Sequence, residues 1–171
     1  ITSTINTITN TTLSGLGILS FQLTAIEIGY VVTTIGDNAF NFCTNLTSVT
    51  FGENSQLTSI GNNTFQQCGS LTSLTIPNGV TGIGNYTFQL CSSLTSVTFG
   101  EGSQLTSIED NAFVSSGLTE VTIGFTAATA LGVSAADTTF FGATGPVTIT
   151  VTDGPILATT FSLSNGTEII S

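Results

Sequence analysis

The stretch Ile35-Gly36-Asp37-Asn38-Ala39-Phe40-Asn41-Phe42-Cys43 is repeated three times further along the chain. The copies are Ile60-Gly-Asn-Asn-Thr-Phe-Gln-Gln-Cys68, Ile83-Gly-Asn-Tyr-Thr-Phe-Gln-Leu-Cys91 and Ile108-Glu-Asp-Asn-Ala-Phe113. The shared phenylalanine stands at positions 40, 65, 88 and 113, so the period is 25, then 23, then 25 residues. A fixed period of this size is typical of a solenoid, in which each coil buries its apolar edge only against its neighbours.

Each copy leads into a second phrase, which alternates between apolar and hydroxyl side chains. Its first form is Leu46-Thr-Ser-Val-Thr-Phe51, and the later forms end at Ile76, Phe99 and Ile123. Alternation with a period of two predicts a strand whose Val49 and Phe51 point inward while Ser48 and Thr50 point outward. A second short strand is expected at Leu57-Thr-Ser-Ile60 and its equivalents.

The two phrases together resemble the BspA-type leucine-rich repeat, also called the Treponema pallidum type. The resemblance covers residues 32–124 and is carried by the pattern Ile-x-x-x-Ala/Thr-Phe-x-x-Cys-x-x-Leu-Thr-Ser-Val-Thr-Phe/Ile. It implies a right-handed, β-rich leucine-rich-repeat solenoid, with short strands stacked into parallel sheets and short helical turns on the other side. It also implies a surface or secreted protein used in adhesion or protein interaction, without enzymatic activity.

The repeats differ in their turns and at the last copy. The insertion Gly52-Glu-Asn-Ser-Gln56, repeated as Gly100-Glu-Gly-Ser-Gln104, lengthens two coils, whereas Pro77-Asn-Gly79 is a shorter turn at the same place. The segment around Asn-Ala-Phe-x-x-Cys is long enough for one or two helical turns, which an Asp or Asn could cap. In the last copy Ser116 replaces the cysteine and one residue is missing before Leu118, as expected of a terminal coil.

We predict one solenoid domain over residues 1–171. Residues 1–31 form an N-terminal cap and a partial coil, because Leu23-Thr-Ala-Ile-Glu-Ile28 matches the second phrase. Residues 32–124 hold the four clear repeats. Residues 125–171 form a degenerate coil and a C-terminal cap, with a strand at Val147-Thr-Ile-Thr-Val151. Since Ile1 is not an initiator, we expect either a processed secreted product that has lost its signal peptide or a trimmed chain.

The charge of the chain excludes several classes of partner. It contains no Lys, Arg or His and ten acidic residues, which gives a net charge of −10. Without cations the electrostatic basis of nucleic-acid binding is missing, and so is attraction to anionic lipids. No apolar run approaches the length of a membrane span. We therefore expect an extracellular or cell-surface protein that neither binds nucleic acid nor inserts into a membrane.

The same composition removes most catalytic chemistry. Without His or Lys there is no Ser-His-Asp arrangement, no Schiff-base lysine and no imidazole metal ligand. Glu53 and Glu101 hold the same position two coils apart, so strand spacing would put them about 10 Å from each other. This approaches the carboxylate separation of about 6.5–9.5 Å in inverting glycosidases. Both lie in surface turns, however, and we predict no enzyme, no catalytic residue, no cofactor and no metal site.

The cysteines and the Asn-x-Ser/Thr motifs can each be interpreted in more than one way. Cys43, Cys68 and Cys91 share one register, which fits disulfides, a metal site or a ladder of small buried thiols, and the resemblance favours the ladder. Asn-x-Ser/Thr motifs are the acceptors of N-linked glycans. In a chain so rich in Ser and Thr, chance alone produces about as many of these motifs as are present. Asn62 and Asn85 occupy the same register. The candidate glycosylation sites are Asn10, Asn45, Asn62, Asn85 and Asn165.

The outward residues of the main strands form a candidate binding surface, which we call the hydroxyl face. Its members are Ser48, Thr50, Ser73, Thr75, Ser96, Thr98, Glu120 and Thr122. This face suits an adhesion scaffold whose partner is an extracellular protein or glycan. Binding to ice or to a crystal surface is a weaker alternative, because Glu27 and Glu120 interrupt the array of hydroxyls.

The ends of the chain suggest a second kind of partner, the chain itself. A solenoid ends in open faces, and natural proteins blunt such edges with charge, usually lysine. Residues 1–9 are rich in Thr and Ile and residues 161–170 are apolar, with no lysine in either segment. Head-to-tail contact between these ends would be heterologous and would give a filament. The alternative is an adhesin domain excised from a longer repeat array, whose neighbouring coils would cover the same faces.

Overall fold

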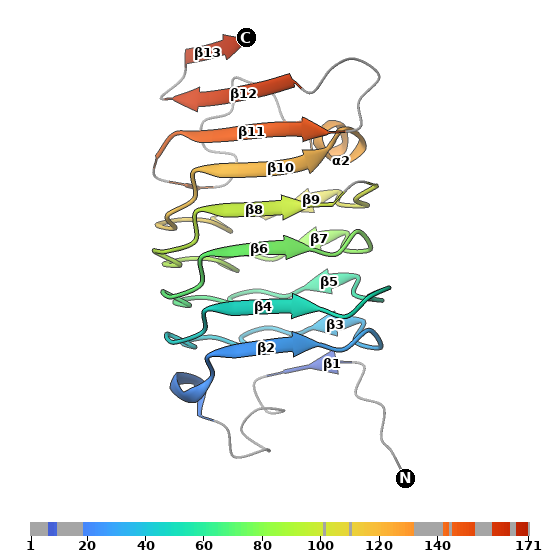
Figure 1. Cartoon of the computed structure of the whole chain (residues 1–171), viewed down its shortest axis with the longest axis vertical. Helices are drawn as coiled ribbons and strands as arrows, with labels where there is room; N and C mark the ends of the chain where they lie inside the picture. The colour runs from blue at the N-terminus through green and yellow to red at the C-terminus, as the bar shows by residue number, and fades with distance from the viewer. Residues whose placement is uncertain are drawn as a thin grey trace.

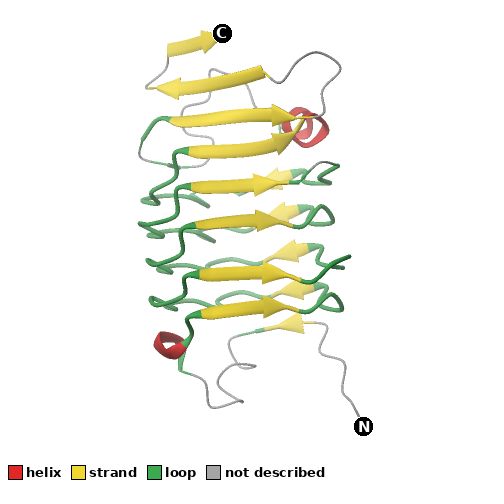
Figure 2. Cartoon of the chain, viewed as in Figure 1, coloured by secondary structure: helices red, strands yellow, loops and turns green. Residues whose placement is uncertain are grey.

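The computed structural model describes residues 7–9, 19–100, 102–109, 111–131, 142–143, 145–152, 159–164 and 167–170. Within them the chain winds into a solenoid whose strands stack along the long axis of the molecule (Figure 1). Through the repeats, front strands of four or five residues alternate with back strands of two residues. Among these residues, helix is confined to a 3-10 turn, η1 (Ser20–Gln22), and one short helix, α2 (Phe125–Ala130), as Figure 2 shows. The predicted leucine-rich-repeat solenoid of parallel sheets is therefore confirmed.

The back sheet is continuous over its five short strands. They are β1 (Thr7–Ile8), β3 (Thr34–Ile35), β5 (Ser59–Ile60), β7 (Gly82–Ile83) and β9 (Ser107–Ile108). All of them pair in parallel, and Ile8, Ile35, Ile60, Ile83 and Ile108 form one column. This column lies within the second short strand expected at residues 57–60 and their equivalents.

The front sheet is divided in two. The strands β2 (Ala25–Ile28) and β4 (Ser48–Phe51) form a two-stranded sheet. A separate six-stranded sheet runs in the order β13, β12, β11, β10, β8, β6. Its members are β6 (Ser73–Ile76), β8 (Ser96–Phe99), β10 (Glu120–Gly124), β11 (Val147–Thr152), β12 (Thr159–Ser164) and β13 (Thr167–Ile170). The parallel ladder is therefore interrupted between β4 and β6, although these strands belong to successive coils.

The C-terminal part changes the direction of pairing. β11 lies where the sequence predicts a strand at residues 147–151, and it continues the parallel ladder of β10. β12 and β13 then pair antiparallel, so the coil repeat ends in a hairpin. The helix α2 follows β10 directly, in an Ala- and Thr-rich segment.

The core consists of columns of identical or similar side chains, one from each coil. Phe40, Phe65, Phe88 and Phe113 are fully buried, and their rings stack at centroid distances of 5.2, 5.6 and 5.0 Å. The leucines that begin the second phrase form a parallel buried column at positions 46, 71, 94 and 118. Because every coil repeats the same side chains in the same register, the facing surfaces of successive coils are complementary in shape.

The segment between the back and front strands is not helical, and the predicted helical turns are wrong. Alternate N–H groups donate to the next coil instead of along the segment: Asn38 to Asn62, Phe40 to Thr64 and Phe42 to Gln66, each at 2.9 Å. An α-helix would direct these N–H groups to carbonyls four residues earlier in the same coil. The segment is a run of tight turns with positive φ at two positions in each coil, for example Asn63 at 52° and Gln67 at 60°.

Candidate interaction surface

The hydroxyl face lies on the front sheet, and the sheet register aligns its residues. Ser73 pairs with Ser96 and Thr75 with Thr98, and the columns continue to Glu120 and Thr122 on β10. The side chains on β4 and β6, together with Glu120, are exposed, whereas Ser96, Thr98 and Thr122 are half-buried. The face also continues onto β11, where Thr148 pairs with Glu120 and Thr150 with Thr122. Sequence reasoning missed these two threonines because only a degenerate coil precedes them, although the alternation in residues 147–151 was visible.

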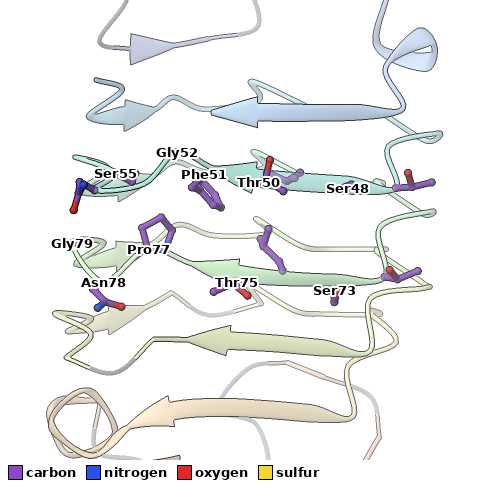
Figure 3. Close-up of a pocket in the computed structure, with 15 residues that line it drawn as sticks. Ser48, Thr50, Phe51, Gly52, Ser55, Ser73, Thr75, Pro77, Asn78 and Gly79 are labelled. Carbon is purple, nitrogen blue, oxygen red and sulfur yellow. The ribbon is translucent and has the colours of Figure 1, made fainter. Parts of the chain in front are cut away.

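The interruption between β4 and β6 opens a groove in the hydroxyl face, which we call the β4–β6 groove. It has a volume of about 800 Å³. Hydroxyl side chains from both strands line it, together with Phe51, Pro77 and the turn residues around Asn54 and Asn78 (Figure 3). No charged side chain is among its lining residues. The hydroxyl face is therefore two surfaces with a polar groove between them.

A column of threonines just before the front strands shows where the ladder opens. The N–H of Thr47 donates to the Thr24 carbonyl, that of Thr95 to Thr72, and that of Thr119 to Thr95. The hydroxyls of Thr47, Thr95 and Thr119 donate to the same carbonyls at 2.9, 3.4 and 3.2 Å. Within the described residues Thr72 makes neither bond to Thr47.

Loop length explains the position of the opening. The loops after β2, β4, β6 and β8 span residues 29–33, 52–58, 77–81 and 100–106, so short and long loops alternate. Each long loop stacks on the short loop before it: Gln56 N–H donates to Tyr30 at 2.9 Å and Gln104 N–H to Asn78 at 2.8 Å. The short loop 77–81 follows a long one, and the Thr81 N–H donates to the Thr58 carbonyl of that loop at 2.9 Å.

Pro77 removes one further bond. In the preceding coil, the N–H of Gly52 donates to the Ile28 carbonyl at 2.9 Å. Pro77 holds the equivalent position after β6 and has no N–H, so it cannot donate to Phe51. The opening also exposes part of the Phe51 side chain, whereas Ile76 and Phe99 in the same column are buried.

The two coils that border the groove stay bonded to each other away from it. The Ser70 hydroxyl donates to the Thr44 carbonyl at 2.8 Å, and β5 and β7 pair on the opposite side of the coil. The groove is thus a local opening of one sheet within a stack that remains bonded on its other sides.

The cysteine ladder is buried and the three thiols are free. Cys68 Sγ donates to the Phe40 carbonyl at 3.3 Å and Cys91 Sγ to the Phe65 carbonyl at 3.1 Å. Burial raises the pKa of the Cys43 thiol to about 11 and that of Cys91 to about 12. It raises the pKa of Cys68 further, with the neighbouring Cys91 and Cys43 thiols adding to the effect. Protonated, buried thiols are poor nucleophiles and poor metal ligands, so this ladder has a packing role.

Among the described residues, the acidic side chains do not assemble into a metal site. Glu53 is exposed on the loop after β4, while Glu101 lies outside the described residues. In the described part of the chain, no three His, Cys, Asp or Glu side chains lie close enough together to hold a metal ion. None of the described helices is long and apolar enough to span a bilayer.

The candidate glycosylation sites differ in their surroundings. Asn10 and Asn165 lie outside the described residues, Asn45 and Asn62 are exposed, and Asn85 is half-buried. Asn45 Nδ2 donates to the Phe21 carbonyl at 2.7 Å, and Asn62 Oδ1 accepts the Asn85 N–H at 2.8 Å.

The threonines of the two aligned motifs have structural partners. The hydroxyl of Thr64 bonds the Gly61 carbonyl at 2.8 Å and that of Thr87 bonds the Gly84 carbonyl at 2.7 Å, and both side chains are buried. Each hydroxyl also reaches a carbonyl of the preceding coil, Gly36 for Thr64 and Gly61 for Thr87. These bonds explain the shared register without invoking glycans.

Comparison with known proteins supports the repeat pattern. The family model of the BspA type leucine rich repeat region matches residues 18–135 in six copies. The search of curated proteins gives no match.

The chain resembles several solved structures, three of which are described below. The Treponema pallidum leucine-rich repeat protein TpLRR is 26% identical over 67% of this chain and 49% of that chain, with a TM-score of 0.56. A Bacteroides ovatus leucine-rich repeat protein is 25% identical over 60% of this chain and 32% of that chain, with a TM-score of 0.50. The pneumococcal vaccine antigen PcpA is 24% identical over 59% of this chain and 25% of that chain, with a TM-score of 0.56. The chain thus spans half or less of each relative.

Proposed function

Since the chain belongs to the BspA-type leucine-rich repeat family, we propose that it is a non-catalytic extracellular scaffold that uses its hydroxyl face for adhesion. The observation that carries this proposal is the face itself. Over β6, β8, β10 and β11 it presents aligned hydroxyls with few charges, and β4 adds Ser48 and Thr50 across the groove. Such a surface offers many hydrogen-bond donors and acceptors without the electrostatic selection that a charged surface imposes.

Two observations support a role without catalysis. The three thiols are buried and protonated at neutral pH, and the acidic residues of the described segments are not gathered into a cluster. The β4–β6 groove also argues against binding to ice or a crystal. A lattice-matching surface requires an unbroken array, and here the ladder that would align the hydroxyls is interrupted between β4 and β6.

The test uses the cells that produce the protein. Antibodies against the chain should label intact cells without permeabilisation, and their Fab fragments should block attachment. A variant carrying Thr98→Lys, which puts a charge in the middle of the hydroxyl face, should lose attachment. Ser93→Lys, on an exposed turn outside the face, should keep it. Labelling that requires permeabilisation would refute the surface location, and equal attachment by both variants would refute the use of this face.

A second candidate function, end-to-end assembly, is favoured by the two ends of the described solenoid. No described strand pairs with the outer edge of β2 or with that of β13. Near the N-terminal end, Leu19, Phe21 and Tyr30 expose 54%, 55% and 60% of their surface. Open strand edges and exposed apolar side chains are features through which subunits join.

Electron microscopy and sedimentation of the native protein test assembly. Filaments that disappear when residues 1–9 are deleted would support a homopolymer. A single species near 17.5 kDa at micromolar concentration would refute it and would favour the alternative, in which further coils of a longer array cover these edges.

A further inference from the structure

The β4–β6 groove has the chemistry of a binding site for a specific class of ligand. Its hydroxyls on Ser48, Thr50, Ser73 and Thr75 make no hydrogen bond to any group in the part of the chain that the structure describes. By contrast, the threonines that flank the strands use their hydroxyls in hydrogen bonds to backbone carbonyls of the preceding coil. Outward hydroxyls such as those of Ser96 and Thr98 on β8 are equally available, and the groove differs in placing such hydroxyls on both sides of one opening.

The charge of the chain limits the ligand. An anionic ligand would find no cation, because the chain has no Lys, Arg or His and a net charge of −10. A cationic ligand would find no carboxylate among the lining residues. The groove thus suits an uncharged ligand that both donates and accepts hydrogen bonds.

The groove also offers apolar surface at one end. The rings of Phe51 and Pro77 both line this end, one from each side of the opening (Figure 3). Phe51 is half-buried here, although the column it belongs to is otherwise buried from Ile76 to Ile123. An apolar ring beside hydroxyl and amide groups matches the two faces of a sugar ring, which is apolar along its C–H groups and polar at its rim.

An extended peptide is the other uncharged candidate, because the facing edges of β4 and β6 lack a ladder between them. A strand inserted between them would need about 4.8 Å on each side, which is about 9.6 Å from β4 to β6. Cα atoms of the two strands still approach within 8 Å of each other. The pairing of β5 with β7 in the same two coils holds the stack against further opening. The groove is therefore wider than a strand pair and narrower than a three-stranded sheet.

We propose that the β4–β6 groove binds a neutral oligosaccharide, with the hydroxyls of β4 and β6 bonding its rim and Phe51 and Pro77 contacting its C–H face. This inference deepens the scaffold function proposed above and rests on it only for the choice of face. The volume of about 800 Å³ lies within the range of about 300–1,000 Å³ typical of small-ligand sites.

The test is an NMR titration of the ¹⁵N-labelled chain with single neutral hexasaccharides: maltohexaose, cellohexaose, laminarihexaose, chitohexaose and mannohexaose. We expect at least one of them to shift amide signals from residues 47–52 and 72–79. Thr50→Val and Thr75→Val, which keep the shape and remove the hydroxyl, should each weaken binding by about fivefold or more. Thr98→Val is the matched control, because Thr98 pairs with Thr75 and lies outside the groove, and it should leave binding unchanged.

Three outcomes would overturn the proposal. One is the absence of shifts with every hexasaccharide at millimolar concentration. Another is equal loss of affinity in Thr98→Val and Thr75→Val, which would place binding on the whole face. The third is that a peptide of alternating Thr and Val shifts the same amides while the sugars do not, which would make the groove a strand-binding site. Attachment of intact cells, measured with the Thr98→Lys variant, is independent of these results, so the groove can fail while the scaffold function stands.

Discussion

Phe65 lies between two other aromatic rings and defines the core at the scale of one residue. Its ring stacks on Phe40 at 5.2 Å and on Phe88 at 5.6 Å, and none of its surface is exposed. A truncation here removes contacts on both sides, because the flanking coils supply the only neighbours that a solenoid coil has. Stability at this scale therefore depends on columns of side chains.

We expect Phe65→Ala to lower the free energy of unfolding by about 3–5 kcal/mol, as for other buried aromatic truncations. Chemical denaturation followed by circular dichroism measures it. Phe42→Ala is the control, because Phe42 exposes 50% of its surface and should change stability little. A loss below about 1 kcal/mol for Phe65→Ala would mean that neighbouring coils do not depend on the ring.

A substitution at Thr64 tests whether its hydroxyl group stabilises the fold. Thr64→Val keeps the shape of the side chain but removes the donor shared by the Gly61 and Gly36 carbonyls. Because the site is buried, we expect a loss of about 1–3 kcal/mol. Thr75→Val on the exposed face is the matched control. Equal stability of the two variants would show that Thr64 contributes no bond that matters, and would revive glycosylation as the reason for the shared motif.

The thiol ladder predicts how stability changes with pH. Cys43 and Cys91 have folded pKa values of about 11 and 12, above the ordinary thiol value of 9.0. As pH rises past 9, the unfolded chain loses thiol protons first, so it binds fewer protons than the native state. Stability is then retained below pH 9 and falls as the pH rises toward 11–12. Urea midpoints across pH 7–11 measure this fall, and Cys68→Ala should make it shallower; an unchanged slope would contradict it.

At the scale of the element, the turn segments show why part of the fold was not predictable from sequence. The strands follow from alternation, and the buried Phe and Leu columns follow from the period. The turns do not, because the sequence around Asn-Ala-Phe is compatible with a helix. The choice is made by the neighbouring coil, whose carbonyls accept alternate N–H groups and hold Phe42 and Leu90 at φ of 61° and 59°.

These positive φ angles give a prediction for Leu90. A β-branched residue is disfavoured in the left-handed region, so we expect Leu90→Val to be less stable than Leu90→Gly by about 1–2 kcal/mol. Leu90 exposes 44% of its surface, so lost burial should not dominate the comparison. Thermal denaturation of the two variants measures the difference. If Val were the more stable, the backbone at this position would not be in the left-handed region.

The candidate site was predictable in composition but not in shape. The outward Ser and Thr residues follow from alternation, and the unequal turns at Gly52 and Pro77 are visible in the sequence. That the ladder opens where a short loop follows a long one is a property of the assembled backbone. It depends on which N–H groups reach the preceding coil, and no pattern within one repeat specifies this.

At the scale of the whole molecule, absence of cations governs the response to acid. The chain has no Lys, Arg or His, so its ten acidic side chains have no basic side chain to pair with. Lowering the pH toward the isoelectric point of about 4.1 reduces self-repulsion and breaks no salt bridge between side chains. We expect solubility to fall near pH 4 while the β signal in circular dichroism stays native. Loss of that signal between pH 7 and pH 4 would contradict this expectation.

The alternation of loop lengths gives the last prediction, which concerns the cooperativity of the stack. Each long loop is hydrogen-bonded to the short loop of the preceding coil, so the coils associate in pairs. The β4–β6 opening lies between one such pair and the next. In a repeat protein each coil is stabilised mainly by its neighbours, so a junction with fewer bonds is where partial unfolding separates the stack. Native-state hydrogen exchange should find the amides of Thr47 and Thr95 protected, because they donate to Thr24 and Thr72. The amide of Thr72, which lacks the equivalent bond, should exchange faster than both. Equal protection of the three amides would show that the ladder is closed in solution, and with it the groove on which the proposed sugar site depends.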